Sequence, residues 1–356
     1  MRSTASTLSA RNRKRHLLAS CAIAAGMAAL TLGGPARAQV QGTGQVILGN
    51  ATISPPAPGV APPNTTNVVA TTNQTVINWT PTDTGTNTAL GAIDFLPEAN
   101  TLNFYGTGQY TVLNRFIGPA AAARPIGLNG TVNSYIGSPS STSGNVQGGN
   151  IWFYNAGGIL IGQRASINVG SLVLTANDID TNGGLFGPGG EIRFRGAPGS
   201  TASIDISPGS FISATNPGSP GSSYIALVAP RINQAGRIEV DGSAALVAAE
   251  QADVTINNGL FDINVTVGTE GGNAILHSGI TTGPEQQGTA PSGQQSRIYF
   301  VAIPKNDAVT MLVSGQVGYQ DAVAAQTDSN GAVVLSAGYN ITDGQIDAAP
   351  VNDTAA

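Results

Sequence analysis

The residues whose types and spacing come nearest to a chemical site are Asp178, Asp180 and Asn182. They stand in the stretch DIDTNGGL, which supplies carboxylates, an amide and glycine at the first positions of a calcium-binding loop. The twelfth position of such a loop holds a bidentate glutamate, and here it is Gly189. The flanking residues are typical of strand and turn, so a polar corner of a β-structure is the favoured interpretation and calcium binding the weaker one. No metal and no cofactor are expected.

The other titratable residues do not form a catalytic set that a motif would identify. His277 is the one histidine after residue 38, and no serine or acidic partner accompanies it in a motif. In EIRFRG, Arg193 and Arg195 share one face of a predicted strand beside Glu191. Such arginines could contact an acidic sugar, although a solvated ion-paired face is the more typical outcome. The sequence therefore predicts a protein that is not an enzyme.

The N-terminal segment from Met1 to Ala38 predicts export. A basic segment at Arg11–Arg15 precedes an uncharged Ala- and Leu-rich run at Leu17–Leu32, and PARA ends at Ala38 with small residues in the positions that signal peptidase reads. The apolar run is short for a membrane anchor, which needs about 20 residues. We therefore expect a signal peptide with cleavage after Ala38, export through the inner membrane, and an extracellular or cell-surface location.

Charge and cysteine content exclude several classes of partner and chemistry. Without residues 1–38 the chain holds nine basic and 20 acidic side chains, a formal net charge of −11. So acidic a chain is not expected to follow phosphate backbones, which excludes nucleic acid as a partner. Cys21, the one cysteine, lies in the predicted signal peptide, so the mature chain has no disulfide and no thiol nucleophile. Few charges and 47 glycines are typical of strands joined by tight turns.

Units of strand, turn and strand recur after residue 145. ASINVGSLVLTA begins at Ala165, ASIDISPGSFISA at Ala202 and GRIEVDGSAALVAA at Gly236, so the unit returns at nearly even intervals. Between these units stand GGNIWFYN, GGEIRFRG and SSYIALVA. Alternation places Ile167 and Val169 on one face of a strand. Stacked imperfect repeats predict a β-solenoid, and the alternative, a β-sandwich, would not explain why the unit returns.

In such a solenoid each coil stacks about 4.8 Å above the previous one, so equivalent side chains form ladders. We expect apolar ladders inside, Gly and Asn at corners, and Asn, Thr and Ser outside, because stacked like charges would repel. At about 20–25 residues per coil, the mature chain is predicted to form about a dozen coils. Residues 39–80 are expected to cap the first coil, because a bare solenoid end exposes strand edges.

Four spaced blocks carry a family resemblance. They are INW (Ile77–Trp79), VLNRF (Val112–Phe116), GNIWFYNAGGILIG (Gly149–Gly162) and ASINVGSLVLTANDI (Ala165–Ile179). In these blocks the chain resembles the secretion domain at the N-terminus of filamentous haemagglutinins, the exported partner in two-partner secretion. The sequence departs from the family's N-P-N-G-I motif, because Ala156 and Gly157 replace its Pro and second Asn. ANTLN at 99–103 is only weakly similar to the family's N-P-N-L motif.

The resemblance implies an all-β, right-handed parallel β-helix that an outer-membrane β-barrel transporter with periplasmic binding domains carries across the outer membrane. Surface adhesion is the implied role, with a host-cell or surface glycan as the receptor. Residues that keep the family's pattern early in the chain are Trp79, Asn114 and Arg115. The motif expected to form a corner and to be recognised by the transporter comprises Asn155, Gly157, Gly158, Ile159, Asn168 and Gly170. Asn155 is also predicted to bond backbone groups at its corner.

With the resemblance, the chain is expected to have four parts. They are a signal peptide (1–38), a Pro/Gly-rich lead-in (39–67), a haemagglutinin-like β-helix domain of two-partner secretion (68–260), and a continued solenoid (261–356) with a loop near 281–295 and a polar C-terminal tail. One alternative function is that of a carbohydrate-active β-helix enzyme, a polysaccharide lyase or hydrolase, and another is that of a self-associating surface or biofilm scaffold with no specific receptor. Such an enzyme needs clustered carboxylates, or basic residues with bound calcium.

Overall fold

A computed structural model gives the fold of the chain. It describes residues 40–54, 64–83, 91–141, 144–181, 190–257, 260–283 and 297–318, together with four short strands between 324 and 350. The predicted signal peptide, Asn182, most of the expected loop near 281–295 and the end of the polar tail lie outside the described residues. The residues from Ala38 onward form one compact unit.

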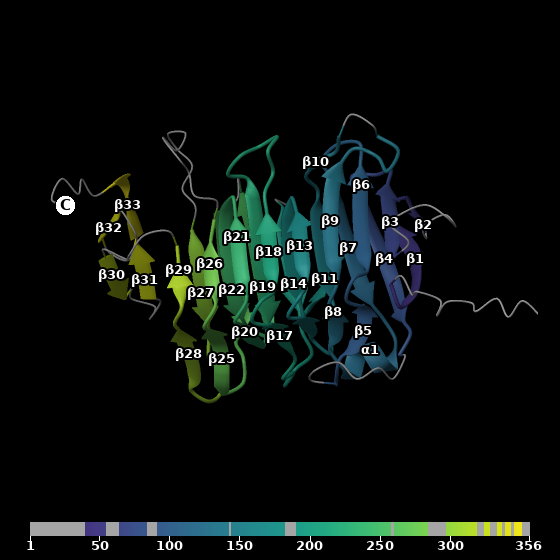
Figure 1. Ribbon diagram of the computed structural model, residues 1–356. Coiled ribbons are helices and arrows are strands. Elements are labelled where there is room, and N and C mark those ends of the chain that lie inside the picture. The colour runs from purple at the N-terminus through teal and green to yellow at the C-terminus, as the bar shows by residue number, and fades with distance from the viewer. Residues whose placement is uncertain are drawn as a thin grey trace, which may run out of the picture. The chain divides into compact units, whose positions relative to one another are not determined.

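Three sheets of mostly parallel strands form the main part of this unit (Figure 1). Sheet A contains, in spatial order, β1 (Gly42–Leu48), β4 (Gln74–Pro81), β7 (Thr111–Phe116), β11 (Asn150–Tyr154), β14 (Ser171–Thr175), β19 (Ser223–Ala229), β22 (Gly242–Ala248) and β27 (Ile298–Ala302). Sheet B contains β2 (Ala51–Ser54), β3 (Thr65–Ala70), β6 (Thr101–Gly106), β9 (Thr131–Ile136), β13 (Ser166–Val169), β18 (Phe211–Ala214), β21 (Arg237–Val240), β26 (Ile280–Thr282) and β29 (Gln316–Val317), with β10 (Val146–Gln147) beside β9. Sheet C contains β5 (Ile93–Leu96), β8 (Ile126–Leu128), β12 (Ile159–Ile161), β17 (Ser203–Ile206), β20 (Arg231–Gln234), β25 (Gly272–His277) and β28 (Val309–Val313).

The chain visits the sheets in a fixed order, C then B then A, and each return adds one parallel strand to every sheet. This is a parallel β-helix, so the all-β solenoid predicted from the repeats is confirmed. A short helix, α1 (Pro119–Ala123), interrupts one A-to-C corner, where Pro at the first turn and the following alanines favour helix. Two antiparallel hairpins follow the last coil, β30 (Ala324–Thr327) with β31 (Val333–Ser336) and β32 (Tyr339–Thr342) with β33 (Gln345–Pro350).

The predicted coil length and coil number are wrong. Successive stacked positions in sheet A are Leu172 of β14, Ile225 of β19 and Ala244 of β22, so one coil is far longer than the next. Sheet A has seven parallel strands in the described residues, from β4 to β27, rather than about a dozen. The long coils contain insertions that form a separate antiparallel sheet, sheet D, from β15 (Asp178–Ile179), β16 (Glu191–Arg195), β23 (Gln251–Asn257) and β24 (Leu260–Val267).

The three sequence repeats, predicted to be equivalent, do not stack on one another in space. SINV lies in β13 of sheet B and RIEV in β21 of the same sheet, but SIDI lies in β17 of sheet C. Ile167 instead stacks on Ile212, which stacks on Ile238. EIRFRG lies in sheet D and not in the helix. The strands of sheets B and C that hold SINV, SIDI and RIEV carry the same alternation, so the sequence does not distinguish these two faces of the coil.

Side-chain alternation fills the interior as predicted. Ile167 and Val169 are fully buried while Asn168 between them is half-exposed. The core runs from Trp79 and Phe95 through Phe104 and Phe153 into the later coils. A second apolar cluster lies on the outer face of sheet A, where sheet D covers it with Ile192, Phe194, Ala252 and Val254. That outer face is apolar because it is a buried surface between two sheets.

The N-terminal end is closed by strands of opposite direction. β1 pairs antiparallel with β4, and β2 pairs antiparallel with β3. Val46 and Ile53 from these strands pack against the core. The backbone N–H of Gln41 donates to the carbonyl of Phe95 in β5, at 2.7 Å. β1 and β2 therefore cap the first parallel strands of sheets A and B. The cap is shorter than the predicted residues 39–80, because β3 and β4 already pair in parallel with the next coil.

His277 joins strands of the last coils. Its Nδ1 lies 2.6 Å from the carbonyl oxygen of Ser314, an acceptor, so Nδ1 carries the proton and Nε2 accepts from the Thr281 hydroxyl at 2.9 Å. The Ser314 N–H donates back to the His277 carbonyl, and the ring packs edge-on against Phe300, with centroids 5.4 Å apart. Burial lowers the pKa of His277 below its ordinary value.

This depressed pKa predicts acid-sensitive folding. The unfolded chain binds the proton first, so the free energy of unfolding falls as the pH drops below about 6.5. Urea titrations of a protein comprising residues 39–356, at pH 7.5 and pH 5.5, measure the effect. His277 is the one histidine after residue 38, so a His277→Gln variant provides the control and loses most of the change across this window. Equal pH dependence in both proteins would show that His277 does not cause it.

Candidate recognition site

The residues singled out by the family pattern lie in three places. Trp79, Asn114 and Arg115 lie on neighbouring strands of sheet A. Residues 155–159 form the corner between β11 of sheet A and β12 of sheet C. Asn168 lies in sheet B, and Gly170 lies at the following corner into sheet A. The fold does not gather them into one cleft.

Asn155 is fully buried at its corner. Its side-chain amide donates to the carbonyl of Arg124 at 2.9 Å, in the coil below, and to the carbonyl of Gly158 at 2.7 Å. Its own N–H donates to the carbonyl of Thr175 in the coil above, at 3.1 Å. A buried carbonyl without a donor is costly, so Asn155 stabilises the turn and joins three successive coils.

The glycines at this corner are required by space and by backbone conformation. Gly158 has φ of +99°, and a Cβ on it would lie 2.5 Å from the carbonyl oxygen of Ser203. A Cβ on Gly157 would collide with the carbonyl oxygen of Arg124. The next residue, Ile159, begins β12 and is fully buried between Ile126 and Ile204. The motif thus turns the chain sharply and returns it to the core.

Trp79 and Asn114 form one buried polar pair inside the β-helix. The indole Nε1–H donates to Asn114 Oδ1 at 2.9 Å, and the Asn114 amide donates to the carbonyl of Trp152 at 3.1 Å. Asn114 has no exposed surface and Trp79 has 1%. Trp79 also packs edge-on against Phe95, with centroids 5.2 Å apart. The family-pattern Trp and Asn are therefore explained by one hydrogen bond that joins the first coils.

Arg115 points to the opposite side of the same strand. Its guanidinium forms an ion pair with Asp178 of β15, and it lies 5.8 Å from the centroid of the Tyr154 ring. Burial and the nearby Asp178 charge raise the pKa of Tyr154 to about 12. Arg115 thus joins the β-helix to sheet D through a half-buried ion pair and a cation–π contact.

The two aspartates of the candidate calcium-binding stretch form ion pairs with arginines. Asp178 is paired with Arg115, and Asp180 lies 3.6 Å from Arg193, which also contacts Glu191 at 3.4 Å. Arg195 pairs with Asp253 at 2.6 Å. The ion-paired face predicted for EIRFRG is confirmed by these contacts. No group of three metal-ligating side chains occurs within the portion of the chain that the structure describes.

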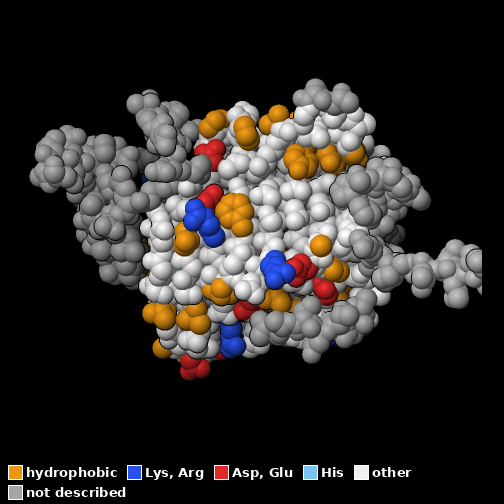
Figure 2. Space-filling model, in the orientation of Figure 1, with side chains coloured by type: hydrophobic (Ala, Val, Ile, Leu, Met, Phe, Trp, Pro, Cys, Tyr) orange, Lys and Arg blue, Asp and Glu red, His pale blue; other side chains and the backbone are white. Residues whose placement is uncertain are grey.

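Asn168 belongs to an asparagine ladder on the outer face of sheet B. Asn168 donates to Asn133 at 3.3 Å, Asn133 to Asn103 at 2.9 Å, and Asn103 to Asn67 at 3.1 Å. The space-filling view of the molecule shows few charged side chains and wide uncharged polar areas (Figure 2). Gly170 has a separate role, because a Cβ there would lie 2.6 Å from the carbonyl oxygen of Gly149.

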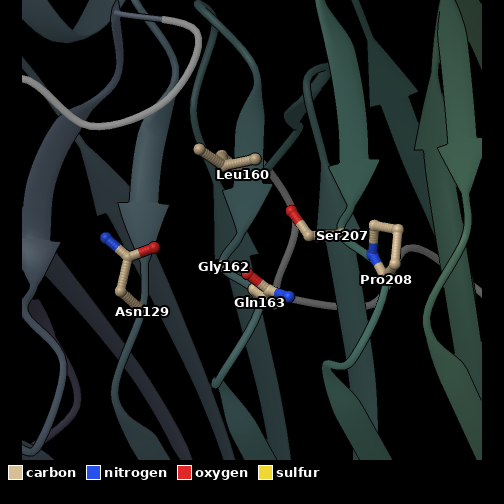
Figure 3. Close-up of a pocket in the computed structure, with 6 residues that line it drawn as sticks. All are labelled: Asn129, Leu160, Gly162, Gln163, Ser207 and Pro208. Atoms are coloured by element: carbon tan, nitrogen blue, oxygen red, sulfur yellow. The ribbon is translucent and has the colours of Figure 1, made fainter.

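One shallow hollow lies along the C-to-B corners. It encloses about 380 Å³ between Asn129 on one side and Ser207 and Pro208 on the other, with Leu160, Gly162 and Gln163 between them (Figure 3). Asn129 donates to Asp94 at 2.7 Å, and burial raises the pKa of Asp94. No carboxylate lines this hollow in the described structure.

Two buried interactions were not predicted from the sequence. The Trp152 indole donates to the Tyr224 hydroxyl at 3.0 Å beneath sheet D. Glu250, whose side chain is 2% exposed, accepts from Lys305 at 3.0 Å and from the N–H of Gly199 at 3.0 Å. Lys305 is the one lysine after residue 38. Its isolation in the sequence was the available signal for its contact with Glu250. Glu250 and then Glu270 raise the pKa of Lys305.

Solved structures with a similar fold include two secretion domains. No protein-family model matches the sequence, and no curated protein matches it. The HMW1 secretion domain from Haemophilus influenzae is similar, with 17% identity, a TM-score of 0.46, and coverage of 74% of this chain and 59% of that chain, which is less than two thirds of its length. A filamentous hemagglutinin secretion domain is similar with 13% identity, a TM-score of 0.42, and coverage of 79% of this chain and 100% of that one. The described residues include no helix that is long and apolar enough to cross a membrane.

The Asn155 geometry predicts a folding defect on substitution. Asn155→Ala removes two donors from buried carbonyls, so we expect a loss of about 1–3 kcal/mol in the free energy of unfolding. Asn168→Ala is the matched control, since Asn168 is half-exposed, and we expect a loss of about 0.5–1 kcal/mol. Urea denaturation of both purified variants, each comprising residues 39–356, measures the two losses. An Asn155→Ala protein as stable as the wild type would contradict the structural role.

Proposed function

We propose that this chain is the exported partner of a two-partner secretion system, with the first coils of its β-helix as the transport domain. The observation that carries the proposal is the placement of the four resemblance blocks. INW lies in β4, VLNRF in β7, the third block begins with β11, and the fourth contains β14. These four strands are consecutive neighbours in sheet A. Blocks separated in sequence thus form one continuous structure at the start of the exported chain.

The proposed partner is an outer-membrane β-barrel transporter with periplasmic domains. We infer that it recognises the chain before folding, because Trp79, Asn114 and Asn155 are buried once the coils have formed. In an extended chain the same side chains are accessible. After transport they form the contacts between coils, and stacking on the first coils supports the folding of the next ones. The absence of cysteine from the mature sequence leaves no disulfide that could block threading.

Surface adhesion is the role proposed for the exported protein, with a glycan of a host cell or surface as its receptor. The support is chemical: the outer face of sheet B carries ladders of hydroxyl and amide groups, which suit hydrogen bonding to neutral sugars. The enzymatic alternative stays a prediction, and no contact in the described residues favours it. Release of reducing sugars by the purified mature protein would establish that alternative.

A secretion assay tests the proposed transport. Residues 1–260 are fused to a reporter and expressed with and without an outer-membrane barrel transporter of a two-partner secretion system. We expect the reporter in the medium only when the transporter is present, and in the periplasm otherwise. A fusion lacking residues 68–180 provides the control and should remain in the periplasm. Secretion that is independent of the transporter, or of residues 68–180, would refute the proposal.

A comparison of the binding of unfolded and folded protein tests recognition before folding. The purified periplasmic domain of the transporter is mixed with mature protein that is either urea-unfolded and freshly diluted or fully folded. We expect binding of the diluted chain and at least a tenfold weaker binding of the folded protein, because the recognised side chains are then buried. Equal binding of both forms would place recognition on the folded surface.

A further inference from the structure

Phe211 is a half-exposed aromatic residue on the outer face of sheet B. It is the first residue of β18, and it stacks on Ser166 of β13 and under Arg237 of β21. Its neighbour Ile212 is fully buried, so the phenyl ring of Phe211 points away from the core. Phe211 belongs to neither of the two apolar clusters. Packing of the core therefore does not explain a phenylalanine at this position.

Phe211 lines a second shallow hollow, which lies along the C-to-B corners of the later coils. The hollow encloses about 520 Å³, a size typical of ligand sites. Its lining includes three corner glycines in successive coils, Gly236, Gly279 and Gly315. Stacking requires these glycines, because a Cβ on Gly279 would lie 2.1 Å from the carbonyl oxygen of Gly236 and one on Gly315 would lie 2.2 Å from that of Gly279. Bare backbone thus leaves room for a ligand beside the Phe211 ring.

Two polar side chains line the same hollow. Arg237 donates from Nε to Glu239 at 2.7 Å and also binds it through Nη2, while its Nη1 has no acceptor among the described residues. Gln316, the first residue of β29, is exposed and donates from Nε2 to the carbonyl of Gly318 at 3.2 Å. Its Oε1 accepts no hydrogen bond in the described part of the chain. Unused donors and an unused acceptor therefore stand beside the aromatic ring.

The chemistry of the hollow fits an uncharged sugar. Glu239 balances the charge of Arg237, and no other charged side chain lines the hollow in the described structure. The net charge of −11 after residue 38 disfavours acidic glycans. The C–H face of a pyranose ring packs against an aromatic ring, and its hydroxyl groups bond to guanidinium and amide groups. An apolar surface with a few polar groups of fixed position is what gives such a site its specificity.

The arrangement of the lining residues also fits a linear chain of sugars. The hollow follows the first residues of β18, β21, β26 and β29, which are consecutive neighbours in sheet B (Figure 1). These residues are one strand spacing apart, about 4.8 Å, in a row along the axis of the β-helix. An extended β-1,4-linked hexose chain advances by a similar distance per sugar. An α-1,4-linked chain winds into a helix and does not follow a straight row.

We propose that Phe211, Arg237 and Gln316 form a binding site for a linear, neutral, β-1,4-linked glycan that lies along this row. One pyranose packs against Phe211, and sugars further along the chain bond to Arg237 Nη1 and Gln316 Oε1. The inference rests on the adhesion role proposed above and assigns its contact site. It does not depend on the proposed transport.

Calorimetric titration of a protein comprising residues 39–356 tests the site. The probes are cellohexaose and the hexamer of β-1,4-linked N-acetylglucosamine, and maltohexaose is the α-1,4-linked control. We expect at least one β-1,4-linked hexamer to bind and maltohexaose to bind at least about tenfold more weakly. Phe211→Ala should weaken binding of that hexamer at least about tenfold, as expected when an aromatic anchor is truncated. Phe211→Trp keeps an aromatic surface and should retain binding.

Tyr135→Ala is the matched control, because Tyr135 is a half-exposed aromatic residue of sheet B outside the hollow. It should bind the hexamer as the wild type does. Urea denaturation of each variant shows that the fold is intact. A wild type that binds neither β-1,4-linked hexamer, or binds maltohexaose equally well, would overturn the inference. Wild-type binding that Phe211→Ala leaves unchanged would overturn the assigned site and leave the proposed adhesion role standing.

Discussion

The structure depends on parallel, in-register stacking of each coil on the one before it. Ile167 lies on Val132 and under Ile212, which lies under Ile238. Each of these residues is one strand spacing from the next, however many residues separate the two strands in the sequence. Because stacked positions hold like side chains, apolar residues form a continuous core and polar residues form continuous outer rows. Insertions are tolerated at corners because they do not alter this register. Sheet D is such an insertion, and it uses the outer face of sheet A as a second core.

In-register stacking also imposes a requirement at the corners. Each turn leaves backbone carbonyls near the core, and these need donors from the same or the adjoining coil. At corners, Asn155 provides donors to Arg124 and Gly158, and Asn177 provides one to Ala249 at 2.9 Å. Within the strands, Asn114 of β7 provides one to Trp152 of β11. An asparagine amide suits this role because it is short, uncharged and carries two donor hydrogens. The abundance of asparagine at these sites therefore has a structural cause, and the proposed recognition by a transporter applies to the same residues before they are buried.

The sequence predicted the fold class because alternation and recurrence reflect local chemistry. Ile167, Asn168 and Val169 were assigned to the correct faces on alternation alone. The spatial partner of each strand could not be predicted, since SINV, SIDI and RIEV have the same pattern although SIDI belongs to a different sheet. The pair formed by Arg115 and Asp178 joins residues 63 positions apart, and a sequence gives no register for such a contact. At the candidate site, the corner role of Asn155 followed from its glycine neighbours, while the Trp79–Asn114 bond required knowledge of which strands stack.

Distance measurements between spin labels on the outer row of sheet B test the stacking register most directly. The row contains Asn67, Asn103, Asn133, Asn168, Ser213 and Glu239. Cysteine pairs can be introduced into residues 39–356 without removing a native cysteine, because the one cysteine of the sequence is Cys21. Labels at 67 and 213 are four strand spacings apart, or about 19 Å, and labels at 67 and 239 are five spacings apart, or about 24 Å. An increase of one strand spacing between the two pairs is the predicted result. Distances that do not differ by one spacing, or that place residue 239 nearer to residue 67 than residue 213, would contradict the stacked β-helix.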